Sequence, residues 1–117
     1  MHVTEPEIVK ESVAAPRAEF DINVPADLLY FQGHFPQQPV LPGVVQIHWA
    51  IQLAKSRLGL GSGFGGIEAL KFHRVIIPLE QLKLTLEHSE QTGKLHFSYV
   101  SELGVHSQGR VLFDQRP

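Results

Sequence analysis

The sequence has no cysteine, no long hydrophobic run and no excess of basic residues. Without cysteine, neither a disulfide nor a thiolate metal site can form, and this fits a reducing compartment such as the cytoplasm. The apolar stretches fall far below the roughly 20 residues that a membrane-spanning helix requires. The N-terminal residues MHVTEPEIVKES carry charges where a signal peptide needs an apolar segment. We therefore expect a soluble, cytoplasmic protein with no membrane partner.

The charge balance argues against a polyanionic partner. Ten lysines and arginines face 12 acidic residues, which gives a formal net charge of -2 and a pI near 6.4. Because phosphate neutralisation needs clustered basic side chains, nucleic-acid binding is not expected. The 117 residues are enough for one domain and too few for two, so we expect a single domain over residues 1–117.

The first half of the chain divides into two strands, a stiff loop and a helix. Residues 7–13 and 18–24 have extended patterns, and the second run alternates apolar with polar side chains. Residues 25–42 contain four prolines, which exclude a helix or a central strand. Residues 43–58 form a helical pattern that is apolar on nearly all sides, followed by Gly59 as a C-terminal cap. Only a surrounding sheet or a partner subunit could bury such a helix.

The second half is strand-like. After a glycine-rich segment at residues 59–66, read as a flexible connector, four strands are expected at residues 67–77, 82–88, 94–101 and 105–113. Two strands, one buried helix and a four-stranded meander indicate an α+β fold.

The segment FQGHFPQQPVLPGVVQ, from Phe31 to Gln46, carries the most specific signal in the chain. It resembles the signature of β-hydroxyacyl-acyl carrier protein dehydratases, in which a Gly-His-Phe-Pro loop runs into the central helix. Gln52, the pair Lys71-Phe72 and Pro78 extend this resemblance. The resemblance implies a hot-dog fold, in which an antiparallel sheet wraps around one long buried helix. It also implies cofactor-free dehydration of an acyl carrier protein thioester, and a dimer with its sites at the subunit interface.

One position departs from that family pattern. The family has Glu or Asp on the helix fourteen residues after the loop histidine, where this sequence has His48. The combination of PVLPGVVQ with His48-Trp49-Ala50 is most similar to the dehydratases of aryl-polyene biosynthetic clusters. The homodimeric or heterodimeric state with another hot-dog subunit stays open.

The residues of the signature suit the chemistry of dehydration. Removal of water needs a base for the α-proton, an acid for the departing hydroxyl and donors for the charge on the thioester oxygen. A histidine is mostly neutral at pH 7, so His34 is available as the base. The amide of Gly43 is an unpaired donor at the positive end of the helix dipole. His48 and Gln52 lie one turn apart on one helix face, where His48 can protonate or orient the hydroxyl.

Other readings of these residues remain open. His34 could cap backbone groups, His48 could be a core histidine paired with a carbonyl, and Gln52 could have a structural role. Phe35 and Val44, beside His34 and Gly43 in the signature, are assigned to substrate binding. The remaining histidines match no ligand spacing, so no metal or cofactor is expected; they are His73, His88, His96 and His106.

Lys71 and Arg74, with His73 between them, form a local basic cluster that could contact the acidic carrier protein or be a solvated edge. Two other functions remain. One is an acyl thioesterase of the same fold, although no carboxylate occurs between Asp27 and Glu68 to activate water. The other is a non-catalytic subunit that pairs with an active dehydratase, which the histidine at position 48 keeps possible.

Overall fold

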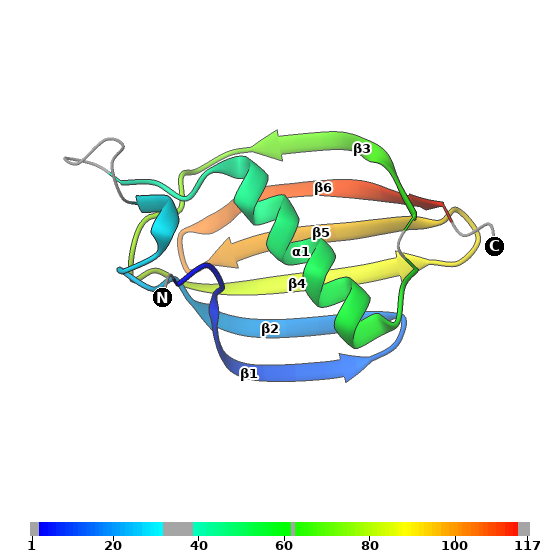
Figure 1. Cartoon of the computed structure of the whole chain (residues 1–117), viewed down its shortest axis with the longest axis horizontal. Helices are drawn as coiled ribbons and strands as arrows, with labels where there is room; N and C mark the ends of the chain where they lie inside the picture. The colour runs from blue at the N-terminus through cyan, green and yellow to red at the C-terminus, as the bar shows by residue number, and fades with distance from the viewer. Residues whose placement is uncertain (1–2, 32–38, 62, 115–117) are drawn as a thin grey trace.

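A six-stranded antiparallel sheet carries one long helix across one of its faces in the computed structural model (Figure 1). The structure describes residues 3–31, 39–61 and 63–114. The strands lie in the order β1-β2-β4-β5-β6-β3, so β1 and β3 form the two edges. The elements are β1 (Glu7–Ala14), β2 (Arg17–Asn23), a short 3₁₀ turn (Leu29–Phe31), α1 (Gly43–Leu58), β3 (Gly63–Phe72), β4 (Gln81–Ser89), β5 (Lys94–Ser101) and β6 (Gly104–Asp114).

The core lies between the helix and the sheet, because the central strands alternate in polarity. On β2, β4 and β5, every second side chain points toward the helix and is buried, while its neighbours face the other side. The helix covers them with Trp49, Ala50 and Ala54, each at most 2% exposed. The buried strand residues include Phe20, Ile22, Leu84, Leu86, Leu95, Phe97, Tyr99 and Val111. The predicted α+β class is confirmed.

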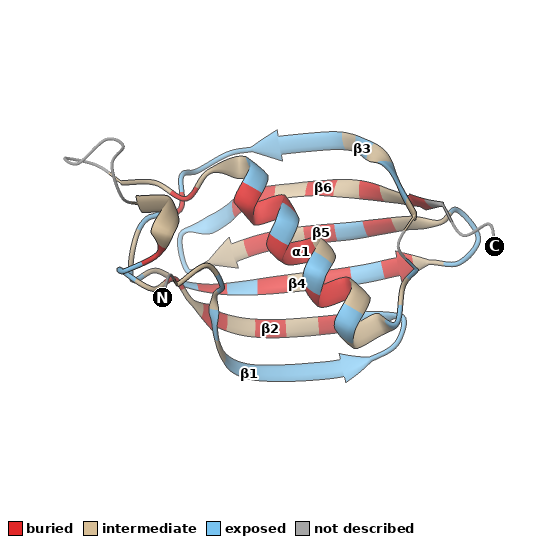
Figure 2. Ribbon diagram, in the orientation of Figure 1, coloured by how far each residue is buried: buried red, intermediate tan, exposed pale blue. Residues whose placement is uncertain are grey.

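The helix has the predicted limits. Pro42 precedes the first turn with φ −59°, a value its ring favours, and Gly59 ends the helix in the left-handed conformation at φ 66°. The expectation of burial on nearly all sides is only partly met in the single chain. Val44, His48 and Gln52, spaced four residues apart, form an exposed stripe on the face turned away from the sheet (Figure 2).

Strand β3 differs from the prediction at both ends. It begins at Gly63 rather than at residue 67, because Gly63–Gly66 pair with the end of β6, so half of the expected connector is strand. At Gly65 an added Cβ would lie 3.2 Å from the Leu112 carbonyl oxygen, a tight contact that the missing side chain avoids. The strand ends at Phe72 rather than at residue 77. The residues that follow leave the ladder, and Leu79 adopts φ 68° beside Pro78.

None of the helices in the described part of the chain has both the length and the hydropathy to cross a membrane.

The burial of α1 can be tested with a charge on its sheet-facing side. Ala50 is fully buried, so Ala50→Glu places an unpaired carboxylate in the core and should lower the free energy of unfolding by several kcal/mol. Ser56→Glu, on the exposed side of the same helix, is the matched control and should change stability by less than about 0.5 kcal/mol. Urea denaturation followed by circular dichroism measures both. Equal stability of the two variants would contradict the placement of the helix.

Candidate active site

The predicted base lies outside the described residues. His34 and Phe35 belong to residues 32–38, which the structure does not describe. The chain is described again from Pro39, and we call the four residues 39–42, just before the helix, the base of the signature loop. Leu41 is buried there at 3% exposure, and its amide donates to the Ile76 carbonyl at 2.7 Å.

The N-terminus of α1 has backbone donors without a partner among the described residues. No side chain caps it, and the Pro42 carbonyl accepts from the amides of Val45 and Gln46 at 3.0 and 3.2 Å. The amides of Gly43 and Val44 make no hydrogen bond to any described residue. They lie at the positive end of the helix dipole, which favours a partial negative charge nearby. The predicted role of the Gly43 amide as an oxyanion donor stays a prediction.

Packing against β3 accounts for the glycine at position 43. The direction that a Cβ would take there is already occupied. An ideal Cβ on Gly43 would lie 2.5 Å from the tip of the Phe72 ring, at the end of β3. Glycine therefore lets the helix start pack directly against β3, and an alanine would push the half-exposed Phe72 ring aside.

His48 and Gln52 share one hollow, as their spacing predicted. It encloses about 330 Å³ beside the exposed stripe of α1. Both side chains are exposed to solvent in the single chain, so His48 is not a buried core histidine. The other walls are Thr4, Glu5, Pro6, Ile8, Tyr30, Trp49, Leu53, Ser56 and Arg57.

The N-terminal segment forms part of this hollow, which sequence reasoning missed. The Trp49 indole N–H donates to the Thr4 carbonyl at 2.9 Å, and the Leu29 amide donates to the Val3 carbonyl at 2.8 Å. These bonds hold residues 3–6 beside the helix and bring the exposed carboxylate of Glu5 to the hollow. Its distance of 43 positions from His48 left no local sequence signal for this placement.

A second missed feature is a buried polar residue on the opposite side of the helix. Gln46 is 3% exposed and faces the sheet. Its side-chain amide donates to the Leu41 carbonyl at 3.2 Å, and its oxygen accepts from the Ser107 hydroxyl at 2.6 Å. The Tyr99 hydroxyl donates to the Gln46 main-chain carbonyl at 2.6 Å. Burial raises the pKa of Tyr99 well above its usual value, so this donor keeps its proton at physiological pH.

The other predicted histidines lie on or beside the strands. Among the residues that the structure describes, no three or more potential metal ligands are grouped. His106 is fully buried, with Nδ1 3.0 Å from the Val75 carbonyl and Nε2 2.7 Å from the Ser101 hydroxyl. Because a carbonyl only accepts, Nδ1 carries a proton, and in the neutral ring Nε2 accepts from Ser101. This histidine therefore joins the β5–β6 turn to the segment after β3.

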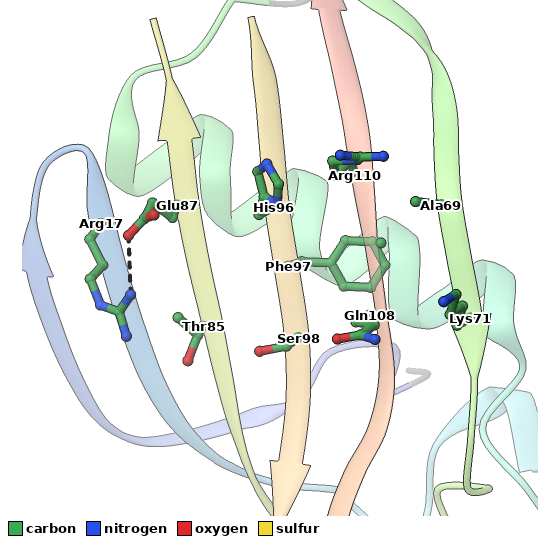
Figure 3. Close-up of a pocket in the computed structure, with 11 residues that line it drawn as sticks. Arg17, Ala69, Lys71, Thr85, Glu87, His96, Phe97, Ser98, Gln108 and Arg110 are labelled. Atoms are coloured by element: carbon green, nitrogen blue, oxygen red, sulfur yellow. Dashed lines mark hydrogen bonds and ion pairs between the residues drawn. The ribbon is translucent and has the colours of Figure 1, made fainter. Parts of the chain in front are cut away.

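Lys71, one of the predicted carrier-protein contacts, lies in a different hollow from His48. Lys71 belongs to a hollow of about 450 Å³ on the sheet face opposite the helix, where it lies across from Arg17 and Glu87 (Figure 3). The arginines of this face are neutralised by carboxylates: Arg17 bonds Glu87 at 3.1 Å, and Arg110 lies 3.1 Å from Glu68. Arg74 is exposed just beyond the end of β3. Within this chain, Lys71 and the helix stripe thus face opposite sides of the sheet.

Known proteins share this sequence and arrangement. A family model described as ApeI-like, ApeI dehydratase, matches residues 10–110. A 3-hydroxyacyl-[acyl-carrier-protein] dehydratase FabZ from Clostridium novyi is 39% identical over 92 residues, which cover 73% of this chain and 65% of that protein. Other FabZ relatives are matched over 54% and 68% of their length, so the chain spans about half to two thirds of these curated relatives.

Two solved structures share the fold over almost their whole length. The dehydratase heterocomplex ApeI:P from Xenorhabdus doucetiae has a TM-score of 0.88 at 32% identity, covering 95% of this chain and 99% of that one. An uncharacterized protein from Erwinia carotovora subsp. atroseptica has a TM-score of 0.84 at 30% identity, covering 93% and 95%. The predicted hot-dog fold is confirmed. Because the family model matches residues 10–110 of the 117, the chain belongs to the ApeI-like dehydratase family.

Proposed function

We propose that this chain dehydrates a β-hydroxyacyl thioester carried on acyl carrier protein to the trans-2-enoyl thioester, without a cofactor. One observation carries the proposal: the exposed stripe of Val44, His48 and Gln52 begins at two amides of the helix N-terminus that bond to no described residue. This arrangement would provide donors for a thioester oxyanion and polar side chains for a departing hydroxyl along one helix face. The names of the FabZ relatives and of the family support the same reaction.

The reaction needs two proton transfers and one anion site. In our proposal His34 removes the α-proton, and the Gly43 amide stabilises the negative charge on the thioester oxygen. The Cβ–O bond then breaks, and His48 donates the proton with which the hydroxyl leaves as water. Gln52 orients that hydroxyl, while Phe35 and Val44 contact the apolar part of the substrate. The resemblance to aryl-polyene dehydratases makes an unsaturated chain with an aryl head group the preferred substrate to test.

The first test follows both water loss and acyl release from a β-hydroxyacyl carrier-protein thioester by mass spectrometry. The wild-type protein should lose water, and His34→Ala should lower the rate by about 10²–10⁴-fold while circular dichroism stays unchanged. Release of the acyl group instead would indicate a thioesterase. Inertness of the chain alone, with activity restored by a second hot-dog subunit, would indicate a non-catalytic partner. A folded His34→Ala variant with normal turnover would remove His34 from the mechanism.

The role of His48 is tested by two substitutions and by pH. An acid that must be protonated gives a rate that falls as the pH rises and the imidazolium loses its proton. His48→Glu restores the residue type usual in the family and should keep substantial activity, whereas His48→Leu should lose most of it. Rates measured from pH 6 to 9 distinguish the cases. If His48→Leu matches the wild type over this whole range, His34 acts alone as base and acid.

We further propose that a second hot-dog subunit, identical or related, covers the β3 edge. An uncovered strand edge with apolar side chains favours pairing with another chain. Figure 2 shows β1 and β3 exposed, but they differ in character. Strand β1 carries Val9 and Val13 among charged residues, whereas the β3 edge and the segment after it expose seven large apolar side chains. These are Phe64, Ile67, Leu70, Phe72, Val75, Ile77 and Leu79. The ApeI:P heterocomplex is a precedent for pairing of two different subunits.

Light scattering after size-exclusion chromatography tests the edge. The wild-type chain should elute at about twice its 13.1 kDa mass, or form a complex of that size with a related hot-dog subunit. Ile67→Lys should shift this species to the monomer, because a charge on the paired edge is left unsolvated. Val9→Lys on the opposite edge is the matched control and should leave the mass unchanged. A monomeric wild type that binds no hot-dog partner would refute the proposal.

A further inference from the structure

We infer that Gln46 is a positioning residue, which fixes the base of the signature loop and the rotation of α1 and thereby sets where Gly43 and His48 stand. The inference rests on the proposed function for its catalytic meaning. Its geometric part stands on the hydrogen bonds alone.

The side chain of Gln46 is oriented by what surrounds it. The Leu41 carbonyl can only accept, so the nitrogen of the Gln46 amide must face it, at 3.2 Å. The oxygen then faces β6 and accepts from the Ser107 hydroxyl at 2.6 Å. Both ends of a 3%-exposed amide are therefore satisfied, in a single orientation. Since the other buried side chains of α1 are aliphatic or aromatic, these bonds supply directional contacts that packing alone does not.

Through these contacts Gln46 holds the chain just before the helix. The Leu41 carbonyl is bonded to Gln46, and the Leu41 amide is bonded to the Ile76 carbonyl at 2.7 Å. The neighbouring carbonyl of Val75 is held in turn by His106. Leu41, at the base of the signature loop, is thus held through both its amide and its carbonyl. Gly43 follows two positions later.

Gln46 also fixes the helix about its axis. Two residues along a helix amount to about 200°, so Gln46 and His48 point to nearly opposite sides. Ser107 on β6 and Tyr99 on β5 both bond to Gln46, one through its side chain and one through its main-chain carbonyl. A rotation of 10° moves a side chain about 5–6 Å from the axis by roughly 1 Å. A displacement of that size can cost about 10²-fold in rate.

The central experiment compares Gln46→Met with a control of matched stability. Gln46→Met keeps the length of the side chain and removes both of its hydrogen bonds. Leu86→Ala, at a buried position on β4 that makes none of the hydrogen bonds described for Gln46, supplies a comparable loss of core stability. Both variants are assayed well below their unfolding temperatures, where both are folded. Gln46→Met should lose about 10²-fold in kcat with little change in KM, while Leu86→Ala keeps the wild-type kcat. Equal kcat values in the two variants would overturn the inference.

A rescue variant adds a readout that a purely stabilising residue would not move. In Gln46→Glu, a protonated carboxyl can donate to the Leu41 carbonyl and accept from Ser107, whereas the ionised group can only accept. Among the described residues, the titratable side chain bonded to Gln46 is Tyr99, whose hydroxyl stays protonated. The kcat of Gln46→Glu relative to wild type should therefore approach one at low pH and fall as the pH rises. A pH-independent ratio would overturn the inference.

Amide hydrogen exchange separates this inference from the proposed function. The Leu41 and Val45 amides should exchange at least tenfold faster in Gln46→Met than in Leu86→Ala. Exchange at the same rate in both variants would overturn the inference, even with a loss of kcat. If the wild-type chain shows no dehydration at all, the proposed function fails. The exchange comparison then still decides whether Gln46 holds the loop base and the helix start.

Discussion

The structure depends on one apolar helix lying against one face of a six-stranded sheet. The buried side of α1 and the inward side chains of β2, β4 and β5 make a common core, and each would be exposed without the other. This packing fixes the direction of the helix, and with it the place of the Gly43 and Val44 amides, which bond to no described residue. It also divides the helix into a buried side and an exposed stripe. The candidate site occupies that stripe, so the same burial that stabilises the fold creates the surface on which chemistry can occur.

The fold was largely predictable because its signals are local. Alternation on β2 and the turn residues between the later strands identify the sheet, and Pro42 and Gly59 mark the limits of the helix. The errors concern β3, where the partner strand decides the outcome. Gly63–Gly66 pair with β6 because the backbone of Leu112 approaches closely, and nothing in the glycine-rich segment itself specifies that partner. Register with a distant strand is a tertiary property that local patterns do not encode.

The candidate site was predictable only where it is contiguous in sequence. Four-residue spacing brings His48 and Gln52 to one hollow, as a helix must. The N-terminal wall of that hollow is held by a hydrogen bond from Trp49 to Thr4, 45 positions away. Sequence periodicity does not predict a contact between residues so far apart. Gln46 is part of the signature, but its apolar neighbours in the sequence give no sign that its side chain bonds to the loop base and to β6. Its partners on β5 and β6 lie 53 and 61 positions away.

The replacement of an acidic residue by His48 changes the charge balance of the site. An ionised carboxylate at this position would carry a negative charge, whereas an imidazole is neutral or positive. On the helix itself no acid is available, and the only carboxylate among the described walls of the hollow is Glu5, from the N-terminal segment. That segment is held in place by Trp49, the residue next to His48. Position 48 thus supplies an imidazole in place of a carboxylate, and the hydrogen bond of Trp49 holds the N-terminal segment with Glu5 beside the same hollow.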